Sequence, residues 1–121
     1  MAMSADPIGQ LLRREGHLPL TIEDRPRLDA LLAAHPALLA GLRDALALAA
    51  QHFPAAAEIR VSVKDDPDYP EGGCYVVAAV WTHESVDAVF PRKQAMTAAW
   101  LAGDVDRVRL PLLLAVRYRE R

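Results

Sequence analysis

The feature that most constrains the fold is a change in the spacing of apolar residues within one short chain. Between residues 38 and 53 apolar side chains recur at intervals of three and four, the period of an amphipathic helix. After Pro54 the period falls to two, and Ile59, Val61 and Val63 alternate with polar residues, as in a strand with one buried face. A helix followed directly by a strand predicts an α+β fold, and 121 residues leave room for one core.

Two helices are predicted before this boundary. The first runs near Asp24–Ala34, where Thr21 and Asp24 have the spacing of a capping box. The second begins at His35-Pro36, because proline disfavours helix in the residue before it but suits a helix's first turn. Pro54 ends this second helix, so the order begins with two helices in succession.

A third helix is predicted over residues 84–103, with Ser85 as its N-cap and Gly103 as its end. Pro91 lies inside it, which predicts a kink or two short helices near Phe90. The positions expected to face the core are Val86, Val89, Phe90, Met96, Trp100 and Leu101.

Two further strands complete the predicted fold, a three-stranded, mainly antiparallel sheet in the order ααββαβ with the helices on one face. Residues 73–82 are apolar at both odd-numbered and even-numbered positions, so both faces of the strand are apolar. This predicts a strand covered on both sides, or on one side by another subunit. Residues 108–118 alternate, and Pro111 places that strand at an edge or a bulge. We favour an order with the first strand in the centre; the alternative places the doubly apolar second strand there.

Composition narrows the class of protein. The net charge of −2, from 14 basic and 16 acidic residues, argues against a protein that coats nucleic acid or anionic membranes through bulk charge. A lone cysteine, Cys74, forms no internal disulfide, and neither a secretory signal nor a membrane-spanning stretch is visible, so we expect a cytoplasmic protein. Twelve of the 14 basic residues are arginine, a skew that suggests GC-rich codons and a prokaryotic source.

The chain is expected to form one domain over residues 21–121, preceded by a loosely attached arm of residues 1–20 that contains two prolines and two glycines. Within residues 36–118, the run HPALLAGLRDALALAAQHFP, the turn DDPDYPEGG, the segment ESVDAVFPRKQ and a late tryptophan follow one another. This layout resembles small uncharacterised prokaryotic α+β proteins, a domain of unknown function. The resemblance implies a fold layout and carries no activity with it.

Few residues in the sequence are candidates for catalysis or metal binding. Cys74 and His83 are the candidates for a nucleophile and base, but nine residues of extended strand separate them by about 30 Å. Asp65, Asp66, Asp68 and Glu71 gather carboxylates in one loop, yet the EF-hand spacing is absent and a solvated turn has the same composition. We therefore predict no catalytic residue, no metal and no cofactor, and lean against an enzyme.

The most informative set of residues lies on one face of the predicted sheet. If the alternating apolar residues face the helices, the opposite face combines an apolar centre with arginine and aromatic margins. Its members are Arg60, Lys64, Tyr75, Val77, Ala79, Trp81, Leu113, Ala115, Arg117 and Arg119.

Three interpretations of this face stay open. A homodimer would bury its apolar centre. A nucleic-acid platform would stack bases on Tyr75 and Trp81 while arginines neutralise phosphates. An ordinary solvent face would cover its apolar atoms with arginine stems.

The hydrophobic fraction of 52% exceeds what one chain of this layout buries, so we predict a non-catalytic protein-interaction or regulatory module. It associates with itself through the sheet face or edge, and a larger protein is a further possible partner. A small nucleic-acid-binding regulator is the first alternative, and a small enzyme centred on Cys74 or His83 is the second.

Overall fold

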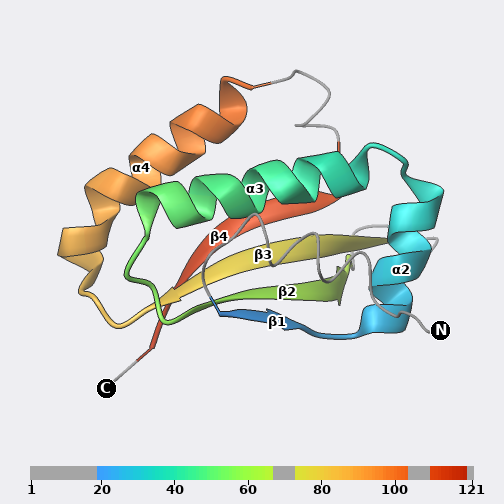
Figure 1. Cartoon of the computed structure of the whole chain (residues 1–121), viewed down its shortest axis with the longest axis horizontal. Coiled ribbons are helices and arrows are strands. Elements are labelled where there is room, and N and C mark those ends of the chain that lie inside the picture. Colours follow the sequence, from blue (N-terminus) through green and yellow to red (C-terminus); the bar gives the residue numbers. More distant parts are fainter. Residues whose placement is uncertain (1–18, 67–72, 104–109, 120–121) are drawn as a thin grey trace, which may run out of the picture.

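The computed structural model describes residues 19–66, 73–103 and 110–119. These residues form an α+β fold in which helices pack on one face of a single sheet (Figure 1). In chain order the elements are β1 (Leu20–Ile22), α2 (Arg25–Ala34), α3 (Leu38–His52), β2 (Glu58–Asp65), β3 (Cys74–Thr82), α4 (Val86–Leu101) and β4 (Leu112–Tyr118). The α+β class is therefore confirmed, while the element count differs from the prediction.

The sheet has four strands in the order β1-β2-β3-β4, and it is mixed. Strands β2 and β3 are antiparallel, whereas β1 pairs parallel with β2 and β4 pairs parallel with β3. The expectation of three mainly antiparallel strands is thus wrong in detail, because helical connections return the chain in the same direction within each parallel pair: α2 and α3 between β1 and β2, and α4 between β3 and β4. The favoured strand order is also wrong: β3, buried on both faces, lies inside the sheet, as in the alternative order.

Strand β1 lies where the predicted arm meets the domain. Leu20 pairs with Ile59, and the amide of Ile59 donates a 2.8 Å hydrogen bond to the carbonyl oxygen of Pro19. Thr21 belongs to this strand and does not cap the next helix. The rest of the predicted arm, residues 1–18, lies outside the described residues, as does the loop at residues 67–72.

Helices α2 and α3 both form, but α3 begins at Leu38, after a turn at residues 36–37, and not at His35-Pro36 as predicted. Asp24 precedes α2 in the left-handed region, at φ 53°, which aspartate adopts more readily than most residues. Helix α3 buries the stripe that the sequence indicates and ends at the residue before Phe53, which is buried in turn. The 3/4 spacing of apolar residues is therefore a sufficient signal for both helices.

Helix α4 departs from the prediction in two ways. The Ser85 hydroxyl accepts a hydrogen bond from the amide of Ala88 at 3.2 Å, so the predicted cap is confirmed, but one helix continues through Pro91. Val89, Met96 and Trp100 are buried, whereas three other positions expected to face the core are exposed: Val86, Phe90 and Leu101. Phe90 and Leu101 each follow a buried residue by one position, which rotates them by about 100° around the helix.

The core lies between the helices and one face of the sheet. Ile59, Val61 and Val63 on β2 face the same side as Val76, Ala78 and Val80 on β3. Val116 extends this layer onto β4, and helix residues such as Leu42 and Leu46 pack against it. Among the described residues no single helix is long and apolar enough to cross a membrane; only α2 and α3 taken together, bent by 119°, satisfy that test.

Gly41 allows α3 to approach the start of β4. A methyl group at Gly41 would lie 2.5 Å from Leu110 Cδ1 and 3.6 Å from Leu112 Cδ2. Gly41→Leu is therefore expected to lower the free energy of unfolding by about 1–3 kcal/mol through overpacking, measured by urea denaturation. Ala40→Leu, at the exposed neighbouring position, is the control, and equal stabilities for the two variants would contradict this account.

Candidate protein-interaction surface

The sheet face opposite the helices carries the residues that the sequence assigned to it. The register places Arg60 beside Ala79, Lys64 beside Tyr75, and Trp81 beside Arg117. Val77 pairs with Leu113, and Ala79 also pairs with Ala115. These side chains share one parity, so the predicted composition of the face follows from the pairing.

The apolar centre of this face is already buried in a single chain. Val77, Ala79 and Ala115 are only 5%, 6% and 9% exposed, and Tyr75 and Trp81 pack against them. A second copy that docked flat on this face would bury Leu113, which is 47% exposed, but would remove little further apolar surface at Val77, Ala79 and Ala115. The face therefore offers less to a partner than its sequence suggests.

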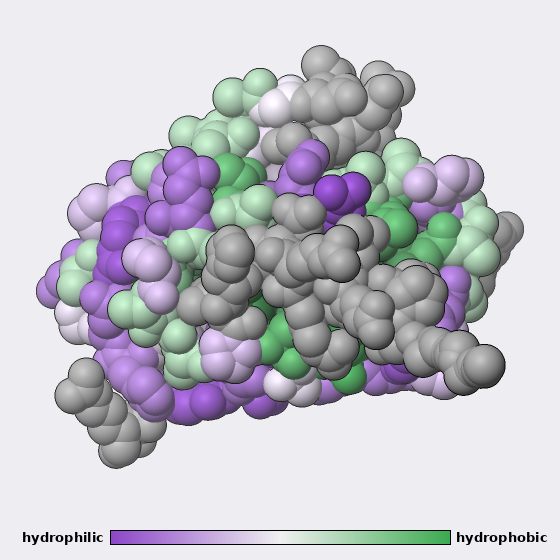
Figure 2. All heavy atoms as spheres, viewed as in Figure 1, coloured by the Kyte–Doolittle hydropathy of each residue, from purple (hydrophilic) through white to green (hydrophobic). Residues whose placement is uncertain are grey.

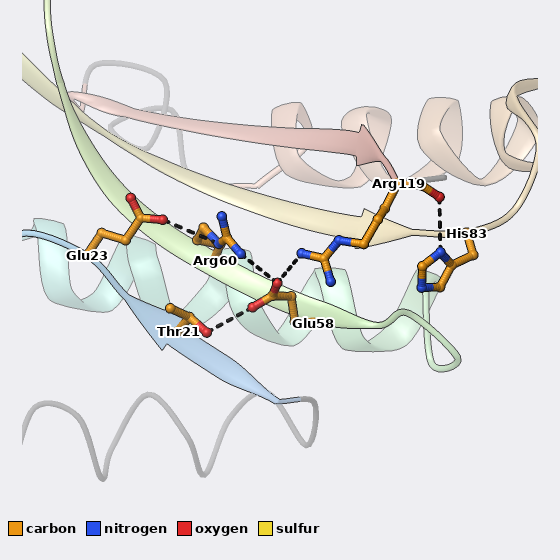
Figure 3. A network of polar contacts seen from close by, with 6 residues as sticks. All are labelled: Thr21, Glu23, Glu58, Arg60, His83 and Arg119. Atoms are coloured by element: carbon orange, nitrogen blue, oxygen red, sulfur yellow. Dashed lines mark hydrogen bonds and ion pairs between the residues drawn. The ribbon is translucent and has the colours of Figure 1, made fainter. Parts of the chain in front are cut away.

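Glu58 joins the strands at one end of this face (Figure 3). Its carboxylate accepts hydrogen bonds from Arg60 Nη2 at 2.8 Å, from Arg119 Nη2, and from the hydroxyl of Thr21 at 2.8 Å. Arg60 also lies 3.3 Å from a carboxylate oxygen of Glu23. We call Thr21, Glu58, Arg60, Trp81 and Arg119 the Glu58 cluster, which connects β1, β2 and β3 with the end of β4.

The charges of this cluster are largely matched within it. The Glu58 side chain is 13% exposed, and hydrogen bonds from Arg119, Thr21 and Arg60 hold the pKa of its carboxyl below the usual value of 4.5. The guanidinium carbons of Arg60 and Arg119 lie 5.3 and 5.1 Å from the centroid of the Trp81 ring. The ring is therefore occupied by two cationic groups that already share a carboxylate.

The large exposed apolar side chains lie on two consecutive elements, and one of them, Leu113, belongs to the sheet face. Among the described residues they are Val86, Phe90 and Leu101 on α4, and Leu113 and Tyr118 on β4, with exposed fractions from 39% to 56%. In Figure 2 the residues over the upper end of α4 are mostly pale green, that is, weakly hydrophobic. Clustered exposed apolar side chains mark interaction sites more often than scattered ones.

A groove runs between α4 and β4. It is lined by Thr97, Trp100, Leu101, Leu112, Leu113 and Leu114 and encloses about 260 Å³. That volume is below the range of about 300–1,000 Å³ typical of small-molecule sites, and five of its six lining residues are apolar. The groove therefore suits one or two side chains of a protein partner.

In the described part of the chain β4 is the last strand of the sheet, so no described strand pairs with the backbone groups on its outer side. The amide of Val76 donates to the carbonyl oxygen of Pro111 at 2.8 Å. The amide of Arg119 donates to the carbonyl oxygen of Thr82 at 2.9 Å. Odd-numbered residues of β4 thus bond to β3, and the alternation of a parallel ladder turns the even-numbered residues toward the open edge. We call β4, its groove and the exposed side chains of α4 the α4–β4 edge.

The structure separates the residues considered for catalysis. Cys74 begins β3 and His83 follows its other end, about 30 Å away. His83 Nδ1 lies 3.0 Å from the carbonyl oxygen of Arg119, which only accepts, so this nitrogen donates.

Asp65 pairs with Arg27, while Asp68 and Glu71 lie outside the described residues. No group of three metal-ligating side chains occurs in the part of the chain described.

Sequence reasoning allowed for association through a sheet edge but did not assign α4 to it, and it missed Thr21 and Glu58 as partners of Arg60 and Arg119. Phe90 and Leu101 were assigned to the core, although both are one position out of step with the stripe of Val89, Met96 and Trp100. Glu58 shares its parity with Arg60, which was a usable signal for their contact.

Comparison with known proteins gave no match: no protein-family model matches the chain, no curated protein matches its sequence, and no solved structure matches its fold. The resemblance to a domain of unknown function accordingly stays a prediction, and the case for function depends on the geometry of the fold and its surfaces.

Proposed function

We propose that this protein is a non-catalytic protein-interaction module that associates with itself through the α4–β4 edge. The observation that carries the proposal is the place of the exposed large apolar side chains. Within the described residues all five lie on α4 and β4, and two of them, Leu101 and Leu113, line the groove beside the edge of β4. A strand edge of this kind pairs readily with another strand unless it is covered.

The edge supports association better than the sheet face does. Val77, Ala79 and Ala115 on the face are buried in one chain, whereas Leu101 on α4 is 56% exposed and Tyr118 at the end of β4 is 39% exposed. Backbone groups at the edge add hydrogen bonds to this apolar contact. A cytoplasmic, prokaryotic homodimer is the form of the module that we propose.

Binding of single-stranded nucleic acid stays a less supported alternative. A base would have to displace Arg60 or Arg119 to stack on Trp81, and both arginines are bound to Glu58. An enzyme centred on Cys74 or His83 is likewise less supported, since these residues lie at opposite ends of β3.

Sedimentation equilibrium on the full chain tests the proposal. At micromolar concentrations we expect a mass of twice the 13.3 kDa of one chain, falling toward 13.3 kDa on dilution. A mass of 13.3 kDa at every concentration up to the millimolar range would overturn the proposed function. Titration with a single-stranded oligonucleotide at low salt is the companion experiment, and tight, salt-sensitive binding by a monomer would favour the alternative.

A further inference from the structure

We infer that two copies of this chain pair along β4 in antiparallel orientation, with a two-fold axis at Ala115, so that both sheets join into one. The inference rests on the proposed function and adds the partner surface, its register and the side chain that fills the groove. Three independent features of the structure agree on it: the backbone pattern of β4, the groove beside α4, and the distribution of charge along the strand.

The backbone pattern allows this register. In β4 the even-numbered residues turn their carbonyl groups toward the open edge, as do the amides of Leu114, Val116 and Tyr118, whereas the amide of Leu112 donates to the carbonyl oxygen of Leu110 at 2.8 Å. An axis at Ala115 sets Leu112 opposite the partner's Tyr118, and Leu114 opposite the partner's Val116. Leu114 and the partner's Val116 then exchange two hydrogen bonds, and the carbonyl oxygen of Leu112 accepts one from the amide of the partner's Tyr118. The seven residues of β4 then overlap completely, whereas an axis at Leu114 or Val116 leaves residues at an end of the strand without a strand partner.

The groove accepts the side chain that this register brings to it. Tyr118 is 39% exposed and shares the parity of Leu112, so it lies on the helix side of the sheet. Opposite Leu112, the partner's Tyr118 lies over the groove lined by Thr97, Trp100 and Leu101. An aromatic ring with a polar tip suits an apolar groove that opens to solvent, because the ring is buried while the hydroxyl stays wet.

The charges on β4 do not oppose one another in this register. Arg117 lies opposite the partner's Leu113, and the two copies of Arg117 are separated by four residues along the strand, about 14 Å. Arg119 is already bound to Glu58 in its own chain. At the axis two alanines face each other, and their small side chains let the strands approach. A second copy of this chain therefore fits the edge without a like-charge pair across it.

Disulfide trapping tests the register. In a Cys74→Ser background, Ala115→Cys places two thiols at a pair without hydrogen bonds, where the Cα atoms are about 4.5 Å apart and a disulfide can form. Mild oxidation is expected to convert most of this variant to a covalent dimer. Leu113→Cys and Arg117→Cys in the same background are matched controls, which we expect to stay uncrosslinked because each residue lies about 14 Å from its copy.

A mixing experiment distinguishes the edge from the sheet face. Leu112→Cys and Tyr118→Cys chains, both lacking Cys74, are expected to form a disulfide when mixed, because the register sets these two positions opposite each other. Neither chain is expected to form one when oxidised alone, because each position lies six residues along the strand from its own copy. Both positions lie on the helix side, so a dimer through the opposite sheet face would not form this disulfide. A dimer by sedimentation that crosslinks at neither Ala115 nor the mixed pair would overturn the register and leave the proposed function standing. A monomer by sedimentation would overturn the proposed function itself.

Discussion

Leu113→Lys is expected to raise the dissociation constant of the dimer roughly 30-fold. The substitution replaces an exposed leucine, 47% accessible, so the single chain keeps its fold. In the dimer each lysine would face the partner's Arg117, and two symmetric like-charge pairs together with the lost apolar contact cost about 2 kcal/mol in total. Sedimentation over a concentration series measures the change.

A charge exchange serves as the control for this prediction. In Leu113→Lys/Arg117→Glu each lysine faces a glutamate of the other chain, so association is expected to return to within about threefold of the original. Arg117→Glu alone faces a leucine and is expected to have little effect. Should Leu113→Lys dimerise as tightly as the natural sequence, or should the double variant dissociate as readily as the single one, the register would be wrong.

Glu58→Gln is expected to lower the free energy of unfolding by about 1.5–3 kcal/mol, a large loss for a substitution that changes only the charge of one side chain. The glutamine keeps the size of the side chain but removes the negative charge that Arg60 and Arg119 share. Two guanidinium groups beside Trp81 are then left without their carboxylate. Chemical denaturation at pH 7 measures the difference.

The pH dependence of this effect follows from the lowered pKa of Glu58. The folded chain binds the proton less tightly than the unfolded chain, whose carboxyl has the ordinary value of 4.5. The contribution of Glu58 to the free energy of unfolding is therefore complete above pH 4.5. It is lost as the pH falls through the lowered pKa of Glu58 in the folded chain. The stability difference between the natural chain and Glu58→Gln should shrink over that acidic range.

Glu84→Gln is a matched control for Glu58→Gln. Glu84 lies 2.6 Å from Arg92, but its side chain is 40% exposed, and ion pairs at such positions contribute about 0–1 kcal/mol. Equal effects of the two substitutions at pH 7 would show that the shared carboxylate of Glu58 has no special role in joining the strands.

Much of the fold could be predicted from the sequence because periodicity is a local property. The stripe from Leu38 to Phe53 and the alternation after Pro54 fix one helix and one strand without knowledge of their neighbours. Strand β1 could not be predicted, because three residues carry no period and the strand exists only through its pairing with β2. Strand order could not be predicted from local patterns either, since it depends on which edge of the β2–β3 pair β4 joins after helix α4.

The sheet face could be assembled in advance, but its accessibility could not. Parity alone brings Arg60, Trp81 and Arg117 to one side. Parity gives no information on how far neighbouring side chains cover Val77, which is buried on that face. The α4–β4 edge depends on a rotation of one residue around α4, and that rotation is decided by packing of Trp100 against the rest of the core.

Hydrogen exchange at the open edge of β4 tests the central claim most directly. The amides of Leu114, Val116 and Tyr118 point away from β3, so in a single chain of the described fold they have no strand partner. At high protein concentration we expect these three amides to be protected at least about 100-fold more than at concentrations where the chain is monomeric, while the β3-bonded amides of Ala115 and Arg117 stay protected throughout. Equal exchange of the three edge amides at every concentration would contradict association through this edge.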